Sequence, residues 1–279
     1  MGFIGAGKVG FSLGKYFSVN NIIITGYFSR NFESAKEAAV FTNSKAYSNI
    51  EDLIKDCDTI FITTPDDKIN EVWQNIKNYT IKGKIICHTS GSFSSKIFSQ
   101  INLSGAFGYS IHPIFPFSDK FTSHSKLNNA YFSIEGHKKH IDFLRKFFMD
   151  LGNKVISIDS NKKPLYHLAN VTVSNLVLSL FDIGCDYLKL CDVPRKDAKD
   201  ALLPLICSNI QNIKENDFMD ALTGPIERGD VNTIQKHINV LNENNKELYK
   251  ILSLNLLKIA KDKNKERDYS ELEKLLEES

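Results

Sequence analysis

The chain has 279 residues, of which 42% are hydrophobic and 24% are charged, which is typical of a soluble globular protein with one large or two ordinary domains. Its formal net charge of +2 gives no electrostatic argument for nucleic-acid binding. Five cysteines without a C-x-x-C pair favour buried free thiols in a reducing cytoplasm over disulfides or a metal centre.

The N-terminus carries a G-x-G-x-x-G motif directly behind a short apolar strand expected over residues 2–4. Gly5 permits a tight turn, Gly7 lets the backbone approach a pyrophosphate, and Gly10 lets the following helix pack closely. The pyrophosphate would lie at the helix N-terminus, where unpaired N–H groups favour an anion. The alternative is a glycine-rich turn in an unrelated α/β unit. The cofactor-binding residues expected here are Gly5, Ala6, Gly7, Lys8, Val9 and Gly10.

A second strand is expected over residues 22–27, followed by Ser29 and Arg30. NAD sites usually have Asp or Glu at this point to bind the ribose hydroxyls. A cation and a hydroxyl without a carboxylate instead suit the 2′-phosphate of NADP(H). The alternative is that Arg30 is a solvated loop arginine.

Further strands alternate with helical patterns in the first half of the chain. A helix is expected from Ser48, where Glu51 completes a capping box, and another after Thr64-Pro65-Asp66. This alternation predicts an α/β, Rossmann-like, doubly wound sheet that is mainly parallel, with helices on both faces. The further strands are expected over residues 59–63, 84–88, 107–111, 131–134 and 155–158.

Polar loops follow these strands at their carboxyl ends, where doubly wound sheets bind ligands. We expect Thr64 and Pro65 to contact the cofactor, and Ser90 to contact the substrate. The alternative is that these Thr and Ser side chains only cap the following helices. His112 ends the next strand and is suited to exchange a proton near neutral pH; the alternative is a histidine bonded to the backbone at a turn.

The pattern changes near residue 159, where we expect a boundary between a nucleotide-binding domain (1–159) and an all-α domain (160–279). Pro164 and Pro194 suit first-turn positions, and Asp192 is a candidate cap. No convincing strand follows Pro164. Helices are expected over residues 165–190, 194–213, 231–242, 246–263 and 268–279.

A polar stripe runs along the first of these helices. His167 lies 3, 7 and 8 residues before Asn170, Ser174 and Asn175, so the four share one side of the helix. Burying polar groups is costly, so this side is expected to face a wet cleft or a polar network. Further on, Arg228 lies in a Gly-Pro-rich segment and suits a carboxylate clamp; pairing with Glu227 or Asp230 is the alternative.

The same helix is apolar nearly all round beyond residue 175, so it has to be buried on all sides. Polar residues, among them Asn175, Asp182 and Asp186, favour a core helix over a membrane span. A second copy of the chain is the expected cover, in a homodimer formed by the helical domain. The alternative is a self-sufficient bundle in a monomer. The encircling residues are Leu176, Val177, Leu180, Phe181 and Ile183.

Taken together, these features resemble predicted oxidoreductases that join a Rossmann-like NADP-binding domain to a helical domain of unknown function 2520. The chain is more distantly similar to pyrroline-5-carboxylate reductases and to 6-phosphogluconate and β-hydroxyacid dehydrogenases, which implies an all-α C-terminal domain like theirs. The resemblance rests on the glycine motif, Ser29-Arg30, Thr64-Pro65-Asp66, Ser90-Gly91, Ile111-His112-Pro113, His167 with Asn175, and Thr223-Gly224-Pro225 with Arg228-Gly229-Asp230.

The resemblance implies hydride transfer between NADP(H) and a small carbonyl, imine or hydroxy acid bound between the domains. We expect His167 to donate the proton, His112 to position the substrate or act as an alternative acid, and Asn175 to bind a carbonyl or hydroxyl. Ser90, Ser174 and Arg228 are the further substrate-binding candidates. A non-catalytic NADP(H)-binding redox sensor is the alternative, and a deazaflavin-dependent reductase a third possibility.

One departure concerns the interdomain helix, where β-hydroxyacid dehydrogenases have a lysine a few residues before an asparagine. This chain has His167 in that region, with Lys162 and Lys163 earlier. The proton-transfer scheme of those enzymes is therefore not carried over directly.

Overall fold

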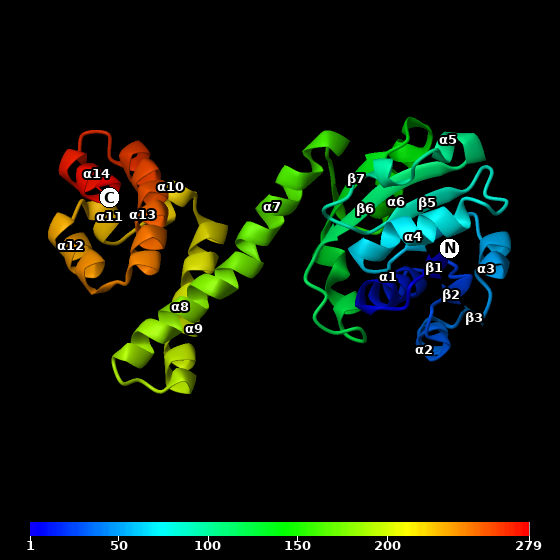
Figure 1. Cartoon of the computed structure of the whole chain (residues 1–279), viewed down its shortest axis with the longest axis horizontal. Coiled ribbons are helices and arrows are strands. Elements are labelled where there is room, and N and C mark those ends of the chain that lie inside the picture. Colours follow the sequence, from blue (N-terminus) through cyan, green and yellow to red (C-terminus); the bar gives the residue numbers. More distant parts are fainter. Residues whose placement is uncertain (279) are drawn as a thin grey trace. The chain divides into compact units, whose positions relative to one another are not determined.

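The computed structural model describes residues Met1 to Glu278 (Figure 1). It divides into two compact units, the first spanning Met1–Val177 and the second beginning at Leu178. Helix α7 (Lys163–Val173) makes its contacts within the first unit. The division between the two units falls after Val177. The domain boundary expected near residue 159 stays a prediction.

The first unit is built on an eight-stranded sheet with the order β3-β2-β1-β4-β5-β6-β7-β8. All neighbours are parallel except β6 and β7, which are antiparallel. The order reverses between β1 and β4, which makes this the switch point of the sheet. The predicted doubly wound, mainly parallel sheet is thus confirmed. The strands are β1 (Gly2–Ile4), β2 (Gly26–Phe28), β3 (Lys45–Tyr47), β4 (Thr59–Ile62), β5 (Ile85–His88), β6 (Phe107–Ile114), β7 (Tyr131–Gly136) and β8 (Lys154–Ser157).

Helices cover both faces of the sheet (Figure 1). Phe3 packs into the core formed with α1, α2 and α6, whereas the adjacent Ile4 packs into the core formed with α3 and α4. Both faces are therefore buried, as the two-residue period of a strand requires in such a fold. The helices are α1 (Lys8–Val19), α2 (Phe32–Thr42), α3 (Ile50–Asp56), α4 (Asp66–Ile76), α5 (Ile101–Ser104), α6 (Ile141–Asp150) and α7.

Two local predictions in this unit need correction. The second strand is present, but it spans Gly26–Phe28 instead of residues 22–27. At Gly26 the backbone of β3 comes close: a Cβ there would lie 2.0 Å from the Lys45 carbonyl oxygen. The cap of α3 is Asn49, whose side chain accepts a hydrogen bond from the Glu51 N–H at 2.8 Å; Ser48 is not the cap.

The second unit is all-helical through Glu278, as predicted. Asp192 does not cap α9: the N-cap is Pro194, and Asp192 adopts a left-handed turn with φ 62°. Cys191 and Cys207 are exposed in the single chain, unlike the other three cysteines. The helices are α8 (Asn175–Leu190), which begins in the first unit, α9 (Arg195–Glu215), α10 (Phe218–Ala221), α11 (Pro225–Arg228), α12 (Val231–Val240), α13 (Glu243–Lys263) and α14 (Ser270–Glu277).

Helices α8 and α9 leave much apolar surface uncovered in the single chain. By length and composition alone, Ser160–Leu190 also qualifies as a membrane span. Its Asp182 and Asp186, however, form ion pairs with Arg195 of α9. We call the exposed apolar side chains of these helices the α8–α9 surface: Leu176, Leu178, Leu180, Leu190, Leu203, Leu205, Ile210 and Ile213.

Candidate functional site

The turn between β1 and α1 has the geometry of an anion-binding site. Gly5 has φ +110°, and a Cβ there would lie 2.9 Å from the Thr63 carbonyl group. A Cβ at Gly10 would lie 2.4 Å from the Gly5 carbonyl oxygen, whereas a Cβ at Gly7 would meet nothing within 4 Å. Gly7 is also the N-cap of α1 and offers no side-chain cap. No side chain caps the first amides of α1, and the space beside Gly7 is open, which suits a pyrophosphate at this helix N-terminus.

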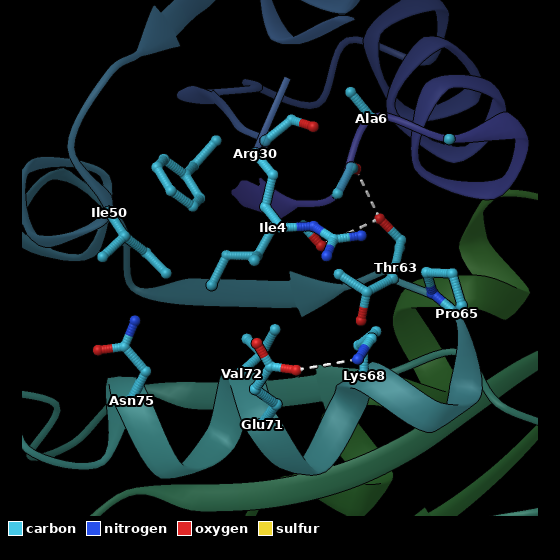
Figure 2. A pocket seen from close by; sticks show the side chains of 15 residues that line it. Ile4, Ala6, Arg30, Ile50, Thr63, Pro65, Lys68, Glu71, Val72 and Asn75 are labelled. Atoms are coloured by element: carbon cyan, nitrogen blue, oxygen red, sulfur yellow. Dashed lines mark hydrogen bonds and ion pairs between the residues drawn. The ribbon is translucent and has the colours of Figure 1, made fainter. Parts of the chain in front are cut away.

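A cavity of about 330 Å³ lies at this turn, at the switch point between β1 and β4 (Figure 2). Seven of the expected cofactor-binding residues line it: Gly5, Ala6, Gly7, Ser29, Arg30, Thr64 and Pro65. The other three, Lys8, Val9 and Gly10, are not among the lining residues. Gly10 instead packs against Thr63, which is the close helix packing expected of the third glycine.

Helices α3 and α4 complete the cavity with residues that sequence reasoning missed. Lys68 forms ion pairs with Glu71 at 3.2 Å and with Asp67 at 3.8 Å. Arg30 forms no ion pair within residues 1–278. The guanidinium of Arg30 is therefore the available cation at the end of β2. The spacing of Lys68, Glu71, Val72 and Asn75 along the helix after Pro65 could have indicated this wall.

One buried polar atom at the cavity supports a missing ligand. Thr64 Oγ1 is buried and has no hydrogen-bond partner among the described residues. Its neighbour Thr63 donates to the Gly5 carbonyl at 2.8 Å and so holds the glycine turn (Figure 2). Buried polar groups without partners are uncommon, so a bound group that accepts from Thr64 fits this position.

A second cluster forms around Gly91, in the loop after β5. A Cβ at Gly91 would lie 2.9 Å from His112 Nε2 and equally 2.9 Å from His167 Cδ2. The structure thus brings together two histidines that are far apart in sequence, one from β6 and one from α7. Their side chains meet over a glycine backbone at the carboxyl edge of the sheet, where a small ligand can approach.

Lys163 and Tyr166 of α7 belong to the same cluster and were not expected. Tyr166 Oη lies 2.6 Å from His112 Nδ1. Lys163 is 1% exposed, and its ammonium donates to Ser110 Oγ at 3.0 Å and to the Ser90 carbonyl oxygen at 3.4 Å. The spacing of Lys163, Tyr166, His167 and Asn170 places them on one side of a helix and could have revealed the cluster.

Burial lowers the pKa values of two groups in the cluster, His112 and Lys163, and of His88 at the base of the same loop. Burial, reinforced by the charge of Lys163 and by His167, lowers the pKa of His112 to about 3. Burial lowers the pKa of Lys163 to about 8, opposed by the carboxylates of Glu135 and Asp66. Burial likewise lowers the pKa of His88 to about 4. His112 and His88 are therefore uncharged at neutral pH.

The Ser90–Ser92 loop is clamped by Asp66. The Ser90 and Ser92 hydroxyls donate to the same Asp66 oxygen at 2.7 and 2.8 Å. Ser90 Oγ also accepts from the N–H groups of Ser92 and Phe93, each at 3.1 Å. Its hydroxyl is thus engaged in holding the loop, and its contact with substrate stays a prediction.

Substrate contacts of Ser174, Asn175 and Arg228 stay a prediction. Ser174 donates to the Asn170 carbonyl at 2.7 Å and to Asn175 Oδ1 at 3.1 Å, and both side chains are exposed. Within residues 1–278, no hydrogen bond joins Asn175 to His112 or His167. Arg228 lies in the second unit, on the exposed side of α11.

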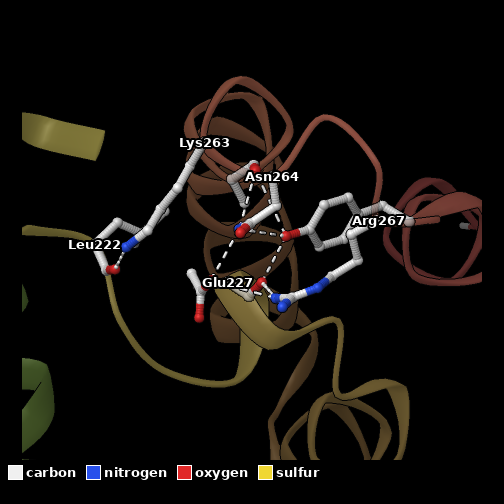
Figure 3. Close-up of polar contacts among 7 residues, drawn as sticks. Leu222, Glu227, Lys263, Asn264 and Arg267 are labelled. Carbon is white, nitrogen blue, oxygen red and sulfur yellow. Dashed lines mark hydrogen bonds and ion pairs between the residues drawn. The ribbon is translucent and has the colours of Figure 1, made fainter. Parts of the chain in front are cut away.

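The neighbours of Arg228 are committed to other partners. Glu227 accepts from Asn264 at 2.8 Å, and its carbonyl oxygen from Tyr269 Oη at 2.5 Å (Figure 3). Asp230 caps α12 by accepting from the Thr233 N–H at 3.0 Å. Arg228 itself forms no ion pair in the part of the chain described. The alternative of simple local pairing is therefore not observed, and the guanidinium stays available.

Comparison with known proteins agrees with this architecture. Residues 1–113 match the model of a Rossmann-like domain, and residues 130–256 match a domain of unknown function, DUF2520. A structure from Thermotoga maritima aligns over 94% of this chain and 99% of its own, with a TM-score of 0.76 and 24% identity. No curated protein matches the chain.

Two further similar structures are named as reductases with NADP bound. A Plasmodium falciparum pyrroline carboxylate reductase with NADP bound covers 95% of this chain and 96% of its own, with a TM-score of 0.61 and 18% identity. An imine reductase from Myxococcus stipitatus in complex with NADP+ covers 95% and 93%, with a TM-score of 0.61 and 13% identity. At these identities the likeness shows the fold.

Proposed function

We propose that this chain, which combines a Rossmann-like domain with a DUF2520 domain, is an NADP(H)-dependent oxidoreductase of a small carbonyl, imine or hydroxy acid. The observation that carries the proposal is the switch-point cavity, where Arg30 lies at the end of β2 and forms no ion pair with the residues that the structure describes. The NADP complexes of similarly folded reductases support the cofactor.

The cavity residues fit this cofactor. The amides at the N-terminus of α1 would hold the pyrophosphate above Gly7. Ser29 and Arg30 would hold the ribose phosphate, and Thr64 Oγ1 would gain the partner that it lacks. When bound, NADPH supplies a hydride to the substrate.

The side chains of the histidine cluster supply the proton and orient the substrate. Reduction of a carbonyl or imine also consumes a proton, and His167 at the Gly91 edge is suited to donate it. His112, which is uncharged and bonded to Tyr166, orients a polar substrate atom. Ser90, Ser174, Asn175 and Arg228 remain predicted contacts of the substrate.

The test measures the loss of NADPH absorbance when the full chain is incubated with panels of ketones, aldehydes and cyclic imines. The variant His167→Ala is measured in the same way. Turnover that falls about 10²–10⁴-fold in the variant is expected. Tight NADPH binding without turnover on any member of the panels would favour the redox-sensor alternative. Turnover unchanged in the variant would remove the role of His167.

We propose further that a second copy of the chain covers the α8–α9 surface. Leu178 and Leu205, 69% and 60% exposed, are typical of this surface, and exposed groups of large apolar side chains often mark protein interfaces. Light scattering should give about twice the monomer mass of 31.6 kDa. Leu205→Glu should lower that mass, whereas Leu103→Glu, on the first unit and 83% exposed, should not. A monomer, or partition into vesicles, would contradict the dimer.

A further inference from the structure

A buried lysine without a carboxylate partner lies under the histidine cluster. Lys163 is 1% exposed, yet within residues 1–278 it forms no ion pair. Its ammonium is held by a hydroxyl and a carbonyl, Ser110 Oγ and the Ser90 oxygen. Burying an unpaired charge is costly, and a purely structural position would be filled more stably by an apolar side chain.

Two carboxylates, Glu135 and Asp66, lie near Lys163 without forming an ion pair with it. Glu135 on β7 accepts two hydrogen bonds from Ser95, at 2.6 and 2.7 Å. Asp66 is engaged by the hydroxyls of the Ser90–Ser92 loop. Both carboxylates therefore act on the lysine from a distance, and they compensate its charge in part.

His112 is a titratable group on which the Lys163 charge acts. Ser110, which accepts from Lys163, and His112 lie on the same side of β6, about 7 Å apart as alternate residues of a strand. The other charged or titratable groups facing His112 are His167 and Tyr166 of α7, His88 of β5 and Asp66. Among all these charges, that of Lys163 is the largest one that opposes protonation of His112, after burial itself.

Tyr166 determines which nitrogen of the neutral ring carries the proton. His112 Nδ1 is the hydrogen-bond partner of the Tyr166 hydroxyl in the described structure. We assign the hydroxyl as the donor, because a phenol usually donates to such an acceptor. The imidazole proton then lies on Nε2, the atom that faces Gly91.

We propose that Lys163 gives the two histidines different tasks: its buried ammonium adds to burial in opposing protonation of His112, which stays a neutral hydrogen-bond donor through Nε2, and leaves His167 to carry the transferred proton. Lys163 is thus a positioning residue that acts through His112. This inference rests on the proposed function for its catalytic meaning, but the charge states that it requires are properties of the protein alone.

The experiment is a histidine titration by nuclear magnetic resonance on the full chain, with labelled imidazole rings and no cofactor. In the wild type, His112 should stay neutral at pH 5 and show the Nε2–H tautomer. Lys163→Met should raise the proton affinity of His112 between about ten- and fiftyfold, as expected for the removal of a nearby unit charge in a protein interior. Lys163→Arg, which keeps the charge, should largely retain the wild-type titration.

Lys162→Met is the matched control, because Lys162 is the adjacent lysine and is exposed. It should leave the His112 titration unchanged. A wild-type His112 that is protonated near pH 6 would overturn the proposal without any variant. An unchanged titration in folded Lys163→Met would also overturn it. Absence of NADPH turnover would instead count against the proposed function and leave these charge states untouched.

Discussion

Replacing Lys163 with methionine is expected to stabilise the first unit at neutral pH. Burial lowers the pKa of this lysine from 10.5 to about 8, which corresponds to about 3 kcal/mol of unfavourable interaction of the protonated form. Methionine removes that cost but leaves Ser110 Oγ and the Ser90 carbonyl without the ammonium, a loss of about 1 kcal/mol. The expected net gain is roughly 2 kcal/mol.

The lowered pKa of Lys163 also predicts how the stability of the wild type changes with pH. Because the folded-state pKa is the lower one, the unfolded chain holds more protons between about pH 8 and pH 10.5. The wild type should therefore gain stability as pH rises through this window, and the advantage of Lys163→Met should shrink there. Other lysines titrate in both proteins, so the difference between the two isolates Lys163.

Urea unfolding at pH 7 and at pH 10 measures both effects. The single tryptophan, Trp73, is fully buried in α4 and reports unfolding of the first unit. A Lys163→Met variant less stable than the wild type at pH 7 would refute the argument. A stability difference that does not change with pH would do the same.

Three further predictions use the same cores and cavities. Acidification should destabilise the first unit, because the pKa values of His112 and His88 are lowered from 6.5 to about 3 and about 4. The unfolded chain is protonated first, so stability is lost as pH falls from 6.5 towards those values. Urea midpoints that stay flat from pH 6.5 to pH 4 would contradict this. Gly10→Ala should lower the free energy of unfolding by about 1–3 kcal/mol, because its Cβ would lie 2.4 Å from the Gly5 oxygen, whereas Gly7→Ala should unfold as the wild type does and yet bind NADPH more weakly in calorimetry. Thr64→Val should weaken NADPH binding without lowering the melting temperature, since Oγ1 has no partner in the described structure; a large loss of stability would show that it has one.

The cofactor half of the site is predictable from sequence because its determinants are local. The three glycines act within a single turn, and Arg30 comes soon after the second strand in the chain. The start of the second strand is less predictable. The apolar run at residues 22–24 suggests a strand there, whereas the pairing with β3 begins at Gly26. Ile23, in that run, is 82% exposed.

The second half of the site depends on tertiary contacts. His112 and His167 are each visible in the sequence, but their meeting at Gly91 follows from how α7 packs on the sheet. Lys163 is the hardest to foresee, because lysines are almost always solvated and one beside Pro164 suggests an exposed first turn. Its burial depends on Ser110 and Ser90, which lie far away along the chain.

Calorimetric titration of the full chain with NADPH and with NADH tests the central claim most directly. Charge-assisted contacts of Arg30 with the 2′-phosphate predict that NADPH binds about ten- to a hundredfold more tightly. Arg30→Ala should remove this preference and leave NADH nearly unchanged, whereas Arg145→Ala, an exposed arginine of α6, should alter neither affinity. Equal affinities for the two cofactors in the wild type, or binding of neither, would contradict the account.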